Sequence, residues 1–154
     1  MAEMRRQDRK LTDDEARKIL SDGEYGIISL CTTDNRGYGV PVNYVFRNDS
    51  VYFHCATEGT KLSCLAANGA VSFCVVGKTK LLPESFGTLY ESAIVSGRAS
   101  ELFDAEKREA LSWLIEKYSS DYLEEGAKYI DAMLSKARVF RISADSISGK
   151  GRRK

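Results

Sequence analysis

Residues 51–61 read Val51-Tyr52-Phe53-His54-Cys55-Ala56-Thr57-Glu58-Gly59-Thr60-Lys61. The first half is rich in β-branched and aromatic residues and follows a polar turn at residues 48–50, which predicts a short strand. The second half begins with His54, the only histidine of the chain, and leads into an apolar helical spacing that starts at Leu62. This stretch therefore predicts a strand, a glycine-containing turn and the start of a helix.

The junction between this strand and this helix has the composition of an anion site. A helix N-terminus presents unpaired backbone N–H groups and the positive end of the helix dipole. Thr57 and Thr60 add hydroxyl donors, and Lys61 adds a positive charge. Many junctions of this composition are ordinary helix caps, and the sequence has no Walker-type or GxGxxG pattern. Local chemistry therefore leaves two interpretations open, a phosphate site and a plain cap.

Residues 38–46 alternate between the two faces of a second predicted strand. The larger side chains share one face, and they are Tyr38, Val40, Val42, Tyr44 and Phe46. Gly39, Pro41 and Asn43 share the other face and leave an open, polar-lined shelf. Because Pro41 cannot donate to a strand ladder, we expect this strand at an edge, at a bulge or beside something that is not a strand. The shelf suits a flat ligand and suits equally an edge strand that tolerates proline.

The remaining pattern predicts a mainly β fold with flanking helices. Further strands are expected over residues 26–32, 70–76, 89–102 and 137–142, with a loose connection at residues 78–87 and a bend or bulge at Gly97. Helices are expected after the capping box Thr12–Glu15, near residue 60, over residues 104–118 and over residues 121–135. Runs of strands joined by short turns predict six antiparallel strands in a small barrel or sandwich, a β+α fold.

The composition indicates one globular domain over residues 1–154. Of these residues 43% are hydrophobic and 29% charged, and the chain is long enough to bury a core of its own. No apolar run approaches the roughly 18 residues of a membrane span, and the N-terminus has no apolar signal segment. We therefore expect a cytoplasmic protein with no membrane contact. The four cysteines contain no CxxC pair, which predicts reduced core thiols and no metal site.

The net charge of +1 is unevenly distributed. Residues 1–10 carry about +2 and residues 150–154 about +4, which leaves about −5 on the residues between them. Basic ends on an acidic body predict solvated tails at residues 1–10 and 144–154. They do not form the basic, aromatic face of a nucleic-acid-binding barrel, so we expect no nucleic-acid partner.

The order of these elements resembles the split β-barrel of the pyridoxamine 5'-phosphate oxidase-like flavoproteins. The closer resemblance is to the subgroup associated with 5-nitroimidazole resistance. The phrases that carry it are Gly39-Val40-Pro41-Val42-Asn43-Tyr44-Val45, residues 51–61, Leu89-Tyr90-Glu91-Ser92-Ala93-Ile94-Val95-Ser96-Gly97-Arg98-Ala99 and Glu106-Lys107-Arg108-Glu109-Ala110-Leu111. Together these phrases extend over most of the chain in the expected order.

The resemblance implies a six-stranded antiparallel split β-barrel that binds FMN at the interface of a homodimer. The isoalloxazine ring would lie along Pro41, Val42, Asn43 and Tyr44, largely through backbone groups. His54 would lie on the cofactor side of its strand, and Thr60 and Lys61 would hold the phosphate. Ser92 would approach the flavin or its phosphate from the partner chain.

Two departures from the family pattern bear on function. Thr60 occupies a position where an Arg or Lys is usual, so the phosphate site has one positive charge fewer. The chain also lacks the C-terminal substrate segment rich in Arg, His and Trp that vitamin B6 oxidation uses, and its single tryptophan, Trp113, lies far upstream. The first departure would weaken FMN binding or shift the contact to a basic residue elsewhere, and the second favours a substrate other than vitamin B6.

The leading hypothesis is an FMN-dependent oxidoreductase of nitroreductase type. It would pass electrons from a reduced donor such as NAD(P)H to a small, flat, electron-poor acceptor such as a nitroimidazole or another nitroaromatic. His54 is the candidate catalytic residue, with a purely positioning role as the alternative. A non-catalytic flavin-binding or sensor module and a pyridoxamine 5'-phosphate oxidase-like enzyme remain open as alternatives.

Overall fold

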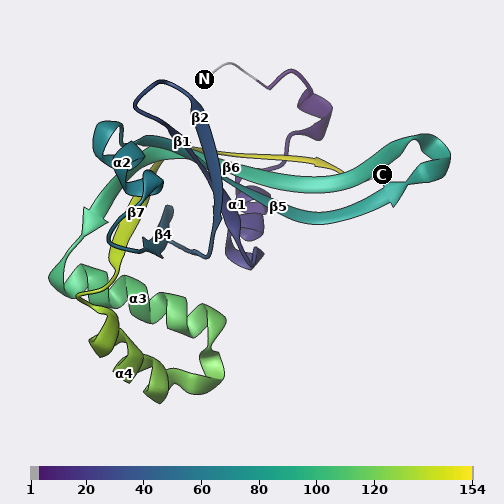
Figure 1. Ribbon diagram of the computed structural model, residues 1–154. Coiled ribbons are helices and arrows are strands. Elements are labelled where there is room, and N and C mark those ends of the chain that lie inside the picture. The colour runs from purple at the N-terminus through teal and green to yellow at the C-terminus, as the bar shows by residue number, and fades with distance from the viewer. Residues whose placement is uncertain (1–3, 154) are drawn as a thin grey trace.

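Seven antiparallel strands form one continuous sheet in the computed structural model, which describes residues 4–153 (Figure 1). The strands are β1 (Gly26–Cys31), β2 (Gly37–Val42), β3 (Val45–Arg47), β4 (Ser50–Cys55), β5 (Ala70–Leu82), β6 (Gly87–Leu102) and β7 (Arg138–Arg152). The α-helices of this part of the chain are α1 (Asp13–Asp22), α2 (Thr60–Ala67), α3 (Asp104–Tyr118) and α4 (Leu123–Met133). The strand order is β2-β1-β5-β6-β7-β4-β3.

The expectation of six strands is wrong by one, because the strand predicted over residues 38–46 divides in two. β2 and β3 lie at opposite edges of the sheet, although only Asn43 and Tyr44 separate them in the chain. The backbone N–H of Tyr44 donates to the hydroxyl of Tyr118 instead of to a neighbouring strand. Since so short a link joins the two edges, the sheet must curl until they meet. No β2–β3 ladder closes the sheet within residues 4–153, so the sheet stays open between its two edges.

The alternation predicted for residues 38–46 survives this division. Val42 and Tyr44 are buried, whereas Gly39, Pro41 and Asn43 are exposed. β2 is an edge strand, as the proline predicts. The shelf on its outer face therefore exists.

Two other strand predictions needed correction. Residues 144–152, expected as part of a solvated basic tail, continue β7 and pair with β6 as far as Arg152 opposite Tyr90. Residues 78–87, expected as a loose connection, extend β5 and β6 into a long hairpin that projects from the barrel (Figure 1). The bulge predicted at Gly97 is confirmed, since the β6–β7 register shifts between Ser96 and Gly97.

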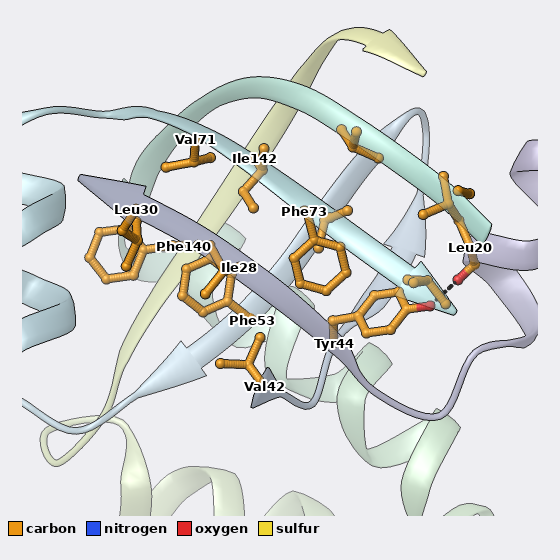
Figure 2. Close-up of a cluster of buried hydrophobic side chains, with 14 of the residues drawn as sticks. Leu20, Ile28, Leu30, Val42, Tyr44, Phe53, Val71, Phe73, Phe140 and Ile142 are labelled. Carbon is orange, nitrogen blue, oxygen red and sulfur yellow. Dashed lines mark hydrogen bonds between the residues drawn. The ribbon is translucent and has the colours of Figure 1, made fainter. Parts of the chain in front are cut away.

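The interior of the sheet is packed with aromatic and branched side chains (Figure 2). Tyr44, Phe53 and Phe73 are completely buried, and the Tyr44 and Phe73 rings meet edge to face at 4.8 Å. Each large side chain buried in this way contributes roughly 1.5–3 kcal/mol of transfer free energy. α1 adds Leu20 to this cluster, and the Tyr44 hydroxyl donates to the carbonyl of Leu20 at 2.5 Å. The predicted capping box that begins α1 is confirmed.

A second apolar cluster lies on the opposite face of β4 and β7. Tyr52 and Val139 pack there against Leu111 and Leu114 of α3 and Ile130 of α4. Helices therefore cover the β7-β4-β3 part of the outer face. On β1, β5 and β6 the outer face leaves large apolar side chains exposed, which are Ile27, Val76 and Ile94. In the described part of the chain, no helix has the length and apolar character needed to cross a bilayer.

Candidate functional site

The turn between β4 and α2 presents hydrogen-bond donors that the protein does not use. Gly59, with φ of 124°, is the N-cap of α2, and no side chain caps the helix. Its carbonyl accepts only from the N–H groups of Leu62 and Ser63, at 3.0 and 3.3 Å. The hydroxyls of Thr57 and Thr60 have no partner within residues 4–153. A side chain at Gly59 would meet no atom within 4 Å, so the space beside these donors is open.

Lys61 supplies a positive charge that no described carboxylate neutralises. Its side chain is half-buried, and its Nζ lies 5.9 Å from the centroid of the Phe53 ring. The ring of Phe53 stacks on Phe140, with the centroids 5.6 Å apart. The lysine is thus held near the barrel wall by an apolar surface, and the ammonium stays available to an anion.

A second cation lies near this end of the barrel, but it is paired. The guanidinium of Arg138 donates to both carboxylate oxygens of Glu101, at 2.8 and 2.5 Å. Arg138 lies opposite Cys55 in the β4–β7 ladder, at the end of β4 that leads into the turn. Glu101 therefore compensates Arg138, whereas Lys61 has no carboxylate partner among residues 4–153.

His54 faces away from the barrel interior, on the side of β4 opposite to Phe53. It lines a small hollow of about 50 Å³ between β4 and the helices. The other lining residues are Leu111, Leu114, Ile115, Tyr129, Ile130, Met133 and Ala137. Although the imidazole is open to solvent on one side, the surrounding atoms and then the charge of Lys61 lower the pKa of His54. At neutral pH the ring is therefore uncharged and can accept a proton.

The segment predicted to support a ring divides into accessible and inaccessible residues. Pro41 and Asn43 are exposed, whereas Val42 is 8% exposed and Tyr44 is fully buried in the core. The polar groups of Tyr44 are all engaged, since its carbonyl accepts from Lys117 Nζ at 2.9 Å while its N–H and hydroxyl are bonded as described above. Within this chain Tyr44 has a structural role, and its contact with a cofactor stays a prediction.

Two residues at the end of α3 hold this segment, and the sequence did not single out either for that role. Lys117 Nζ also donates to the carbonyl of Gly23 at 2.6 Å and lies 3.8 Å from the centroid of the Tyr44 ring. Burial lowers the pKa of Lys117 to about 8. Tyr118 donates to the carbonyl of Glu24 at 2.5 Å and lies within bonding distance of the Tyr44 carbonyl, at 3.0 Å. The sequence predicted only that both residues lie at the end of a helix over residues 104–118.

Ser92 is remote from the β4–α2 turn in the same chain. Its hydroxyl donates weakly to the carbonyl of Lys150, at 3.5 Å. The N–H of Ala99 donates to the carbonyl of Gly69, just beyond α2. Ser92 is seven residues further along β6, which is about 23 Å of strand. Ser92 therefore lies apart from the β4–α2 turn of its own chain.

Solved structures with this fold include flavin-binding proteins. A proposed 5-nitroimidazole antibiotic resistance protein of Bacteroides thetaiotaomicron matches with a TM-score of 0.80 and 24% identity, over 92% of this chain and 86% of that chain. An FAD-binding protein of Mesorhizobium loti matches with a TM-score of 0.64 and 25% identity, over 94% and 97% of the two chains. An FAD and heme binding protein of Mycobacterium smegmatis matches with a TM-score of 0.83 and 16% identity, over 95% and 74%.

Two comparisons of the sequence had different outcomes. No curated protein matches the chain. The family model described as pyridoxamine 5'-phosphate oxidase matches residues 12–151. This match confirms the resemblance inferred from the sequence, and the chain belongs to the pyridoxamine 5'-phosphate oxidase family.

Proposed function

We propose that this protein is an FMN-dependent oxidoreductase that reduces small, flat, electron-poor molecules such as nitroimidazoles and other nitroaromatics. The observation that carries the proposal is the β4–α2 turn, with its unpaired donors and its uncompensated lysine. A flavin supplies hydride and single-electron transfer when it is bound. The protein's contribution is to bind the flavin, orient it and keep water from it.

The turn suits the phosphate of FMN. Two hydroxyls without a described partner, the start of α2 and the charge of Lys61 lie within residues 57–61, where a phosphate would accept several charge-assisted hydrogen bonds, each of about 1.5–3 kcal/mol. Lys61 is the one basic residue among residues 56–61, and a single positive charge suits one phosphate group better than a diphosphate. For that reason we propose FMN, although relatives of this fold bind FAD.

The exposed shelf of β2 suits the ring. Pro41 offers a flat apolar surface without a donor, and Asn43 offers an amide that can bond the edge of a heterocycle. Val42 would contribute its backbone. His54 would offer its ring N–H to a nitro oxygen of a substrate that reaches its side of β4, because reduction of a nitro group consumes protons.

We further propose that two copies assemble through the open outer face of β1, β5 and β6. Ile27, Cys74 and Ile94 form one row across these strands, because Ile27 pairs with Cys74 and Cys74 with Ile94. Ile27 and Ile94 are 39% and 40% exposed, and Val76 beside them is 58% exposed. An apolar row bordered by serines is typical of a surface that another protein covers. In such a dimer Ser92, which borders this row, would serve the partner's flavin.

The experiment is a titration of the flavin-free protein with FMN, followed by flavin fluorescence. Lys61→Ala should weaken binding about 10–100-fold, since it removes one charge-assisted contact. Lys128→Ala, on the exposed face of α4, is the matched control and should bind FMN like the parent. Equal affinity of Lys61→Ala and parent would show that the phosphate lies elsewhere.

Two further measurements separate an enzyme from a flavin sensor. The FMN-loaded protein should oxidise NADH or NADPH in the presence of a nitroimidazole, and sedimentation should give a dimer. A loaded protein that is inactive with every donor and acceptor tested would be a binding module. A monomer that holds FMN would refute the shared site.

A further inference from the structure

The structure joins the two basic ends of the chain into one cavity. The N–H of Leu11 donates to the carbonyl of Gly149 at 3.0 Å, and Lys10 forms a β-bridge with Lys150. Gly149 allows this contact, because a Cβ there would lie 3.0 Å from the Cβ of Leu11 and 2.9 Å from that of Ala16. Residues 7–11 therefore lie against β7, so the described parts of the two predicted tails are not separate, and residues 1–3 and 154 of those tails lie outside the described residues.

The cavity beside this contact has a volume of about 580 Å³ and is strongly cationic. Five of its eight lining residues are positively charged and one is negatively charged. They are Arg6, Asp8, Arg9, Lys10, Leu11, Gly151, Arg152 and Arg153. A 3-10 turn over Gln7–Arg9 brings residues three apart onto the same side, and this places Arg6 and Arg9 together.

Carboxylates neutralise only part of this charge. Arg6 pairs with Asp8, its Nε lying 2.7 Å from Oδ1, and Arg153 pairs with Glu15 and Glu91. The three remaining cations are Arg9, Lys10 and Arg152. None of these three forms an ion pair or a side-chain hydrogen bond with any residue between 4 and 153, and only Arg9 interacts electrostatically with Asp8. Such a grouping of like charges raises the free energy of the folded chain until an anion binds.

We propose that this cavity binds the diphosphate group of a small molecule. Arginine guanidinium groups match phosphate oxygens in a bidentate manner, and three unpaired cations match the several charges of a diphosphate better than those of a single carboxylate. The cavity is also larger than one phosphate requires. A nucleic acid fits less well, because the residues between the two basic ends carry about −5 and would repel a long polyanion.

The site is separate from the proposed flavin phosphate site, and the inference does not depend on the proposed function. Arg152 lies at one end of β7, and Arg138, beside the β4–α2 turn, begins the other end. Fourteen residues separate them, which corresponds to about 46 Å of extended strand. One diphosphate cannot contact both places in the same chain.

The test is isothermal titration of the full chain with sodium pyrophosphate at low ionic strength. We expect one site per chain and at least about tenfold weaker binding in the double variant Arg9→Gln/Arg152→Gln. Arg98→Gln is the matched control, because Arg98 is also exposed and unpaired among the described residues but lies outside the cavity. Lys61→Ala should bind pyrophosphate like the parent.

Three results would overturn the proposal. The first is unchanged pyrophosphate affinity in the double variant, and the second is loss of that affinity in Lys61→Ala, which would assign the anion to the flavin site. The third concerns competition for bound, labelled pyrophosphate. The proposal fails if a short DNA oligonucleotide displaces it at a lower concentration than unlabelled pyrophosphate does. If the double variant does not fold, the site can be located in the parent chain by the backbone amide chemical shifts that change when pyrophosphate is added. Pyrophosphate should shift Lys10, Leu11 and Gly151, and shifts confined to residues 57–61 would refute the site.

Discussion

The hydroxyl of Tyr118 holds the link between the two edge strands to the segment before β1, and Tyr118→Phe removes that one atom without changing the shape of the side chain. The hydroxyl accepts from the Tyr44 N–H at 2.9 Å and lies within donor distance of two carbonyls, those of Tyr44 and Glu24. Its single proton can serve only one carbonyl at a time. The substitution therefore removes an acceptor and one donor.

The lost acceptor accounts for most of the expected loss of stability in Tyr118→Phe. Tyr44 is fully buried, so its N–H would have no replacement partner, at a cost of about 1–3 kcal/mol. The Tyr44 carbonyl keeps Lys117 Nζ at 2.9 Å, and Glu24 is exposed enough for water to bond its carbonyl. These two groups should add little. We expect Tyr118→Phe to lower the free energy of unfolding by about 2 kcal/mol.

Urea unfolding of the flavin-free protein measures this loss. With a slope of about 2 kcal/mol per molar urea, the midpoint should fall by about 1 M. Tyr122→Phe is the matched control, because that ring is 62% exposed and its hydroxyl has no described partner, and it should stay within about 0.5 kcal/mol of the parent. Equal midpoints for Tyr118→Phe and Tyr122→Phe would refute the role assigned to Tyr118.

Three other substitutions test separate parts of the fold. Thr12→Ala removes the side-chain cap of α1, because Thr12 Oγ1 accepts from the Glu15 N–H at 3.3 Å. It should lower the free energy of unfolding, measured with urea, by about 1 kcal/mol. Gly97→Ala should cost more than about 3 kcal/mol or prevent folding, because its Cβ would lie 2.0 Å from the Ser143 carbonyl oxygen at the bulge. Lys117→Met tests how the stability depends on pH. The pKa of Lys117 is about 8 in the folded chain, lowered from an ordinary 10.5, so between these values the Lys117 amine is protonated only in the unfolded chain. The parent should therefore gain stability over Lys117→Met as the pH rises from about 8 to about 10, and a constant difference would contradict the lowered pKa.

The sequence correctly predicted the features that depend only on residues close together in the chain. The capping box at Thr12 and the bulge at Gly97 follow from neighbouring residues, and both are present. Pro41 predicted an edge strand because a missing donor excludes a central position, and β2 is an edge strand. The turn at Gly59 was predicted from composition, and the structure adds the absence of any side-chain cap.

The errors concern interactions between distant segments. Clean alternation over residues 38–46 gives no sign of a division, since Val42 and Tyr44 keep their inward direction on both sides of it. The division depends on Tyr118, which is 74 residues away in the sequence. In the same way, the polar residues after Ile142 do not resemble a buried strand. They form one because β6 is long enough to pair with them.

The joint at Asn43–Tyr44 links the fold to the proposed function. The link between the two edge strands has only two residues, so the backbone groups of Tyr44 cannot pair in the ladder of either strand. Two residues of α3 supply their partners: Tyr118 accepts from the Tyr44 N–H, and Lys117 donates to the Tyr44 carbonyl. The helical layer therefore completes the seam of the barrel as well as covering one face. Asn43 belongs to the proposed ring shelf, and its position depends on the hydrogen bonds that α3 makes with the neighbouring Tyr44. Hydrogen exchange tests that relation: the Tyr44 amide should exchange only through global unfolding in the parent and through local opening in Tyr118→Phe, with a matching loss of FMN affinity. Local opening without any change in FMN affinity would show that the ring does not depend on this joint.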